Sequence, residues 1–232
     1  MPDRLSTLEV VVERSTPNYP TVRLHVDGVD VLDPGHEENG NDPADILDTG
    51  ALVPQSEPRR IAFYGCGCGA FGCFVVAGLI TENAGLVSWT DFRTVTGAYH
   101  SALPDPRDGP DPARSVNTMH EDPDDGLDLP DVHFDAAQYH AAVGAAMRDR
   151  NWESRARAVA RLVRERLPDL SLRAAQHGDV IHLHHQYDGE KWPDQVALAV
   201  PSGSTVAVTD CLVALLEEGR DPREIVRRRL WH

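Results

Sequence analysis

Three of the chain's four cysteines lie within eight residues, in the segment Cys66-Gly-Cys-Gly-Ala-Phe-Gly-Cys73, which we call the knuckle. Apolar runs at 61–64 and 74–80 flank the knuckle. Short apolar runs bounded by glycines are typical of buried strands, and glycine lets the backbone turn tightly between them. The segment therefore predicts two β-strands joined by a cysteine-rich connection.

The knuckle cysteines are spaced C-x-C-x4-C, and thiolates are common ligands of structural zinc. A closed zinc site needs four donors, so the sequence predicts a structural zinc site made of Cys66, Cys68, Cys73 and Cys211. Other candidates for the fourth ligand are His100, His120, His182 and His184. Two further interpretations stay open: reduced thiols that only shape the connection, and a redox role such as a disulfide between Cys68 and Cys73.

The composition is that of an ordinary globular protein. The 232 residues, 41% hydrophobic and 25% charged, fit one large domain or two small ones. Every apolar run is far shorter than the roughly 20 residues of a membrane helix, and residues 1–12 lack the pattern of a secretory signal. We therefore expect a cytoplasmic protein with reduced thiols and no membrane contact.

The net charge of -15 comes from two acidic segments. Residues 27–50 hold eight acids without Lys or Arg, and residues 104–131 hold nine acids against two arginines. This balance argues against non-specific nucleic-acid binding, which needs positive charge. It permits a basic protein partner, although acidic loops that only aid solubility are the alternative.

Hydropathy patterns predict an α+β fold with a mixed, mainly antiparallel sheet. Period-two alternation predicts strands in the N-terminal hundred residues, with turns at Asp27-Gly28 and Ala84-Gly85. Apolar residues at helical spacing predict helices over 134–148 and 152–167. The remainder predicts strands at 170–176, 180–187, 195–200 and 205–208, and a helix over 211–218 capped by Asp210.

Composition also predicts the domain organisation. Residues 104–131 hold six prolines and the whole second acidic segment, so they predict a loop or linker. This divides the chain into a β-rich portion with the knuckle, 1–103, and a helix-plus-sheet portion, 132–232.

The knuckle with Tyr64 before it, followed by Val87-Ser-Trp89-Thr-Asp91-Phe92, resembles a pattern of uncharacterised, mostly actinobacterial proteins. Those proteins carry a C-x-C-G-x-x-G-C knuckle and a V-x-W-x-D-F strand. The resemblance covers about an eighth of the chain. It implies a shared β-hairpin scaffold and supplies no catalytic residues.

Two further polar patterns lie in the C-terminal portion. His182 and His184 are two residues apart on a predicted strand, so they share a face and could bind a metal together. Arg157, Arg161 and Arg164 form a stripe on the helix predicted over 152–167, which fits either an anion site or a solvated face.

No hydrolase, kinase or dinucleotide-binding signature is present in the sequence. We therefore expect a non-catalytic binding or interaction protein, such as an immunity-type or regulatory partner, with a structural knuckle. The alternative is a metal-dependent enzyme that uses His182 and His184 in a cleft between the two portions. The sequence does not predict an oligomeric state.

Overall fold

The computed structural model describes residues 4–16, 19–31, 38–66, 74–99, 101–104, 110, 129–174, 179–185 and 194–224. Contacts divide the chain into two units, residues 1–150 and 151–232. The elements in chain order are β1 Leu8–Thr16, β2 Tyr19–Val26, β3 Val29–Asp30, β4 Glu38–Gly40, α1 Pro43–Ile46, β5 Arg59–Cys66, β6 Val75–Asn83, β7 Leu86–Val95, β8 Val132–Asp135, α2 Ala136–Arg148, α3 Arg155–Arg166, β9 Ser171–Ala174, β10 Val180–His185, β11 Asp194–Ala199 and α4 Thr205–Glu217.

The described part of the chain confirms the predicted α+β class. Its strands form three antiparallel sheets, two in the first unit and one in the second, and helices pack against them. No helix in this part is long and apolar enough to cross a membrane.

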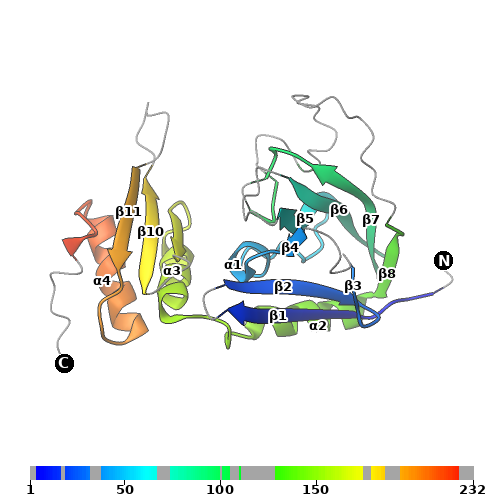
Figure 1. Cartoon of the computed structure of the whole chain (residues 1–232), viewed down its shortest axis with the longest axis horizontal. Coiled ribbons are helices and arrows are strands. Elements are labelled where there is room, and N and C mark those ends of the chain that lie inside the picture. Colours follow the sequence, from blue (N-terminus) through cyan, green and yellow to red (C-terminus); the bar gives the residue numbers. More distant parts are fainter. Residues whose placement is uncertain are drawn as a thin grey trace. The chain divides into compact units, whose positions relative to one another are not determined.

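The first unit pairs a three-stranded sheet, β1-β2-β3, with a five-stranded sheet, β4-β5-β6-β7-β8 (Figure 1). Both edges of the five-stranded sheet reach the smaller sheet. Ser6, just before β1, forms a parallel bridge with Phe134 of β8, and Val22 N–H of β2 donates to the Asn41 carbonyl beside β4 at 2.8 Å. At the second junction a Cβ on Gly40 would lie 2.1 Å from the Val22 carbonyl oxygen, so the two strands can approach only at a glycine.

Two tight turns of the first unit follow the sequence prediction. Asp27 and Gly28 have φ of 53° and 82°, and Ala84 and Gly85 have φ of 51° and 80°. Positive φ at both central residues is the mark of a type I′ turn, whose twist matches that of the strands it joins. These turns produce the β2–β3 and β6–β7 hairpins.

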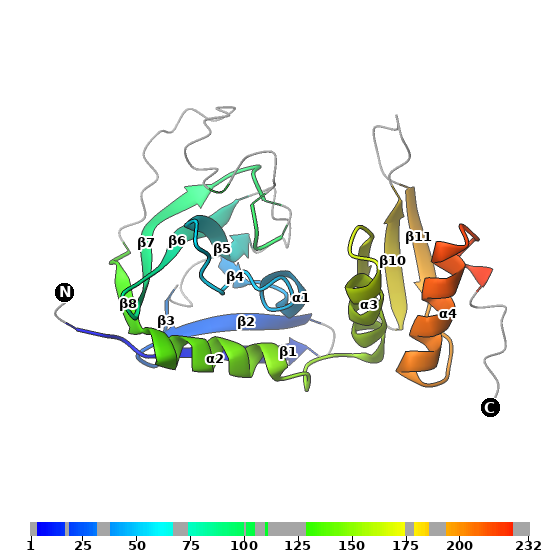
Figure 2. The same cartoon turned by 180° about the vertical axis from the view of Figure 1, so that it is seen from behind.

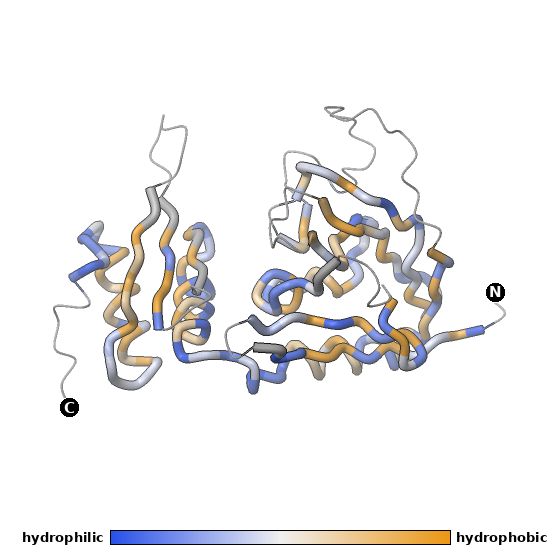
Figure 3. Tube along the Cα trace, in the orientation of Figure 1, coloured by the Kyte–Doolittle hydropathy of each residue, from blue (hydrophilic) through white to orange (hydrophobic). Residues whose placement is uncertain are grey.

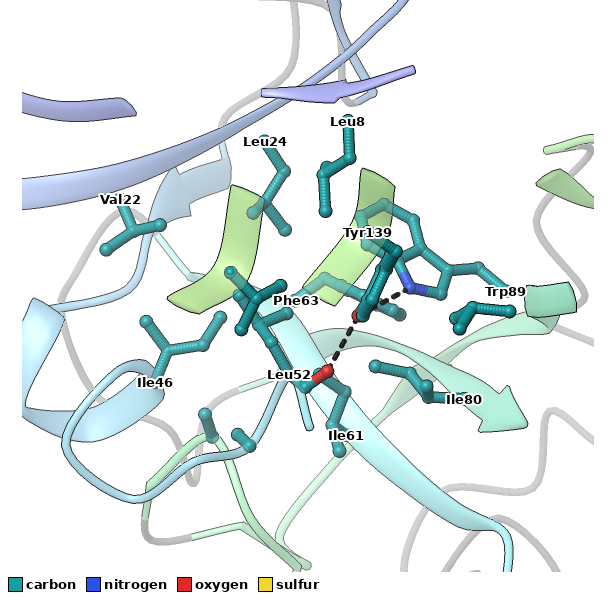
Figure 4. Packing of buried hydrophobic residues seen from close by; sticks show 14 of the residues in the cluster. Leu8, Val22, Leu24, Ile46, Leu52, Ile61, Phe63, Ile80, Trp89 and Tyr139 are labelled. Atoms are coloured by element: carbon teal, nitrogen blue, oxygen red, sulfur yellow. Dashed lines mark hydrogen bonds between the residues drawn. The ribbon is translucent and has the colours of Figure 1, made fainter. Parts of the chain in front are cut away.

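The core of the first unit lies between its sheets and α2 (Figure 4). Tyr139 of α2 is fully buried beside Trp89 of β7, whose indole N–H donates to the tyrosine oxygen at 3.2 Å. The tyrosine hydroxyl in turn donates to the Leu52 carbonyl at 2.7 Å. The labelled apolar residues around them are Leu8, Val22, Leu24, Ile46, Ile61, Phe63 and Ile80.

The division into units differs from the boundary predicted within residues 104–131. β8 pairs with β7, and α2 follows it directly and packs against β1. Burial of Phe134 and Tyr139 therefore holds these two elements in the first unit, and the division falls after Arg150. Composition located the acidic, proline-rich segment but could not show that the chain returns to the same sheet after it.

The second unit holds a three-stranded meander in the order β11-β10-β9. The helices α3 and α4 pack against each other and bury one face of this sheet (Figure 2). Their shared core includes Val159, Val163, Leu172, Ile181, Leu183, Leu198, Leu212 and Leu215.

The prediction of a strand at 205–208 is wrong. Residues 205–217 are the single helix α4, and Ser204, not Asp210, is its N-cap: the Ser204 side chain accepts a hydrogen bond from Ala207 N–H at 3.2 Å. β-branched residues at 205, 206 and 208 imitated a strand pattern. The capping serine and burial of Val208 and Leu212 against the sheet outweigh that weak preference.

Candidate functional site

The knuckle connects neighbouring strands of one sheet. β5 ends at Cys66, whose N–H donates to the Phe74 carbonyl at 3.1 Å, and Gly65 is the register partner of Val75 at the start of β6. Cys66 is half-buried. The prediction that strands enter and leave the knuckle is therefore confirmed, although Cys68 and Cys73 lie outside the described residues.

The fourth cysteine belongs to the other unit. Cys211 lies on α4 and packs partly buried against the core of residues 151–232. Among the residues that the structure describes, no group of three or more His, Cys, Asp or Glu side chains could hold a metal ion. Because two knuckle cysteines are outside that set, the zinc site stays a prediction.

Tyr64, two residues before the knuckle, forms a polar cluster that spans both sheets of the first unit. Its hydroxyl donates to Asp30 Oδ1 at 2.5 Å and accepts from Leu24 N–H at 3.1 Å. The Arg23 guanidinium lies 5.7 Å from the ring centroid and 3.5 Å from Asp30 Oδ2. Burial, and next the hydrogen bond to Asp30, raise the pKa of Tyr64 above its usual value, so the phenol stays protonated and acts as a donor.

A β-bulge explains why Tyr64 reaches this cluster. Register slips between Ala62 and Tyr64 along β5, so Phe63 and Tyr64 both contribute to the main core. Asn41 lies beside the bulge and donates through its side-chain amide to the carbonyls of Ala62 and Phe63, at 2.7 and 3.1 Å. The cluster thus fastens the strand that leads into the knuckle.

The V-x-W-x-D-F strand carries a second cluster. Val87 and Trp89 are fully buried, whereas Asp91 sits at a bulge in β7 with φ of 50°. Its carboxylate accepts from Arg60 Nη2 at 2.5 Å and from Arg93 Nε at 2.8 Å, and its backbone carbonyl accepts from Arg60 Nη1.

Arg60 is fully buried, while the Asp91 side chain is 37% exposed. The hydrogen bond from Arg93 is the largest influence on the pKa of Asp91, and it lowers that pKa together with Arg60, while partial burial opposes them. The ionised carboxylate therefore supplies the counter-charge that a buried guanidinium needs. Asp91 of the motif thus has a structural partner in β5.

His182 lies on β10 with Ala197 and Arg173 as its register partners. It is half-buried, and its Nδ1 is buried with no hydrogen-bond partner among the residues that the structure describes. His184 follows on the same strand, but its side chain lies outside the description. The paired metal ligation of the two histidines stays a prediction.

The arginine stripe on α3 is engaged within its own unit. Arg157 lies over the Trp152 ring at 5.9 Å, and Arg164 donates to the Leu172 carbonyl at 2.8 Å. Arg161 forms ion pairs with Glu153 and Glu165 at 2.7 and 2.8 Å. These contacts give the stripe a structural role in joining α3 to the sheet and to the turn before it.

Sequence reasoning missed a serine and histidine pair on the outer side of the five-stranded sheet. Ser88 Oγ of β7 and His133 Nδ1 of β8 lie 2.8 Å apart, as register partners. The pairing of strand 132–135 with β7 is the signal that would have revealed them. Sequence periodicity could not supply it, because a strand of four residues is too short to detect in that way.

No family model matches the chain, and neither the curated proteins nor the solved structures include one with significant similarity to it. The resemblance of the knuckle and the V-x-W-x-D-F strand to uncharacterised actinobacterial proteins therefore stays a prediction.

Proposed function

We propose that this chain is a non-catalytic interaction protein whose first unit binds a basic protein partner. The observation that carries the proposal is the distribution of charge between the units. Residues 1–150 hold 25 acidic and 10 basic residues, whereas residues 151–232 hold 12 of each. All of the net charge of -15 therefore belongs to one unit.

Ion pairs within the first unit do not remove this excess. Asp27, Asp30 and Asp48 pair with Arg4, Arg23 and Arg150. Those arginines are already included in the count, so the first unit keeps 15 more acidic than basic residues whatever the pairing. A one-sided field of this kind steers and orients a partner of opposite charge.

A salt-dependent capture experiment tests the proposal. We expect the immobilised chain to retain a basic protein from a lysate of its source organism at low salt and to release it near 0.5 M NaCl, where charges are strongly screened. Neutralising Glu121, Asp122, Asp124 and Asp125 to their amides should weaken retention. The matched control neutralises four acids of the second unit, Asp169, Asp188, Glu190 and Glu217, and should retain the partner. Equal loss from both variants, or capture that resists salt, would contradict the proposal.

We also propose that the knuckle is structural and holds zinc through its cysteines. Support comes from the spacing of the three cysteines and from the described hairpin. In that hairpin the backbone N–H of Cys66 donates a hydrogen bond to the carbonyl of Phe74, the residue after Cys73. We expect about one zinc per chain by elemental analysis, lost together with thermal stability in Cys66→Ser. Zinc that persists in Cys66→Ser would refute this role. So would a wild type whose thermal stability is unchanged after its zinc is removed.

A further inference from the structure

β11 is an edge strand of the second unit, and the backbone N–H and C=O groups of every second residue point away from β10. Val200 N–H donates to the Asp179 carbonyl at 2.8 Å, so the N–H of Val200 points toward β10. Alternation along the strand then directs the N–H and C=O groups of Gln195, Ala197 and Ala199 outward. No residue in the described part of the chain forms a hydrogen bond with these outward groups.

Asp194 begins this edge strand and Pro193 and Pro201 flank it, but the interior of the strand lacks the features that usually keep edge strands from pairing. Residues 195–199 contain no charge and no proline, and Figure 3 colours the middle of β11 as hydrophobic. Ala197 and Ala199 are exposed on the sheet face opposite α3 and α4. Edge strands that remain unpaired are usually protected by lysine, proline or a bulge.

We propose that β11 pairs antiparallel with β11 of a second copy of this chain, so that two second units form one six-stranded sheet. The three outward-facing residues, Gln195, Ala197 and Ala199, are evenly spaced about Ala197, so a two-fold axis through Ala197 matches the strand with itself. Ala197 would face its own counterpart, and Gln195 would face Ala199 of the second copy. This register uses the outward N–H and C=O groups of all three residues on each strand and is the isologous contact of a two-fold dimer.

Charge at the two ends of β11 favours a second copy over an unrelated strand. The strand begins at Asp194. At its other end the Arg155 guanidinium donates to the carbonyls of Pro201 and Gly203 and lies 3.7 Å from Asp179 Oδ2, so Asp194 of a second copy would join an existing ion pair there. Antiparallel pairing places the first residue of one β11 beside the Arg155 end of the other. The second unit also has equal numbers of acids and bases, so two such units do not repel through net charge.

A charge-swap experiment tests the pairing. Wild type should sediment as a dimer of the 25.5 kDa chain at micromolar concentration. In Ala197→Lys or Ala197→Glu, like charges would face each other at the two-fold axis, and each variant alone should dimerise at least about fivefold more weakly. An equimolar mixture of the two should recover wild-type affinity or better, because opposite charges then meet.

Recovery in the mixture also shows that both variants are folded. The matched control introduces the same charges at Leu5, an exposed residue of the first unit, and should leave dimerisation unchanged. A monomeric wild type at 100 µM, a dimer insensitive to Ala197, or a mixture without recovery would overturn the inference. Capture of a basic partner depends on the first unit, so its failure and the failure of this pairing are distinguishable.

Discussion

Asp91 of the V-x-W-x-D-F strand has a structural role as the partner of Arg60. The guanidinium is fully buried on β5, and Asp91 reaches it from a bulge in β7 where the backbone has positive φ. A non-glycine residue in that conformation carries strain, which persists only where surrounding contacts compensate for it. The two hydrogen bonds to Arg60 and the one to Arg93 are such contacts.

Replacing Asp91 with asparagine should lower the free energy of unfolding by about 2 kcal/mol. Loss of one partner from a fully buried ion pair costs about 3–5 kcal/mol, and the partial exposure of Asp91 reduces that figure. Urea denaturation at pH 7 measures the change. Glu57→Gln, at an exposed position, makes the same charge change and should alter stability by less than about 0.5 kcal/mol. Equal effects of the two would show that only net charge matters.

Acid should reduce the difference in stability between wild type and Asp91→Asn. The pKa of Asp91 is lower in the folded chain than its usual value of about 3.9. Its contribution to stability is therefore complete above that usual value and is lost as the pH falls through the folded pKa. Denaturation curves at pH 7, 5 and 3 should show a constant difference at the first two and a smaller one at pH 3. A difference that grows in acid would contradict the ion-pair account.

At the scale of elements, turns were predictable where local chemistry decides. The turns at Asp27-Gly28 and Ala84-Gly85 predicted their hairpins correctly, because few residue pairs allow positive φ at both central positions of a turn. Residues 205–208 were wrongly predicted as a strand because β-branched side chains occur in both strands and helices. Packing of α4 against the sheet of the second unit decides in favour of the helix. The bulges that bring Tyr64 to Asp30 and Asp91 to Arg60 depend on register between strands, which periodicity along one strand does not contain.

Ser204→Ala should destabilise the second unit by about 1 kcal/mol. The change removes the side-chain acceptor for Ala207 N–H and so leaves a donor of the first turn of α4 without its cap. Ser202→Ala lies two residues earlier, is exposed and changes the same group outside the cap. Thermal unfolding of both variants measures the effect. A Ser202 variant as unstable as the Ser204 variant would argue against the cap.

At the scale of the molecule, each unit has its own core and its own helices. The first core draws on β1, β2 and the five-stranded sheet, and the second on α3, α4 and β9 to β11. Composition indicated two portions but misplaced β8 and α2, because residues distant in sequence complete the first sheet. Two of the four cysteines predicted to hold zinc, Cys68 and Cys73, lie outside the described residues.

Separate cores predict separate unfolding. We expect two calorimetric transitions, with Asp91→Asn shifting one by roughly 4 °C or more and Ser204→Ala shifting only the other. Each variant serves as the control for the other, because each lies in a different unit. One transition that moves with both variants would mean that the units unfold together.

The close approach at Gly40 bears on how distant relatives of this chain could be recognised. Any side chain there would collide with the Val22 carbonyl, and a Cβ on Gly78 would lie 2.9 Å from the Phe63 ring. Surface loops can drift in evolution without such a penalty. Any relative that keeps this fold should therefore keep glycine at both positions.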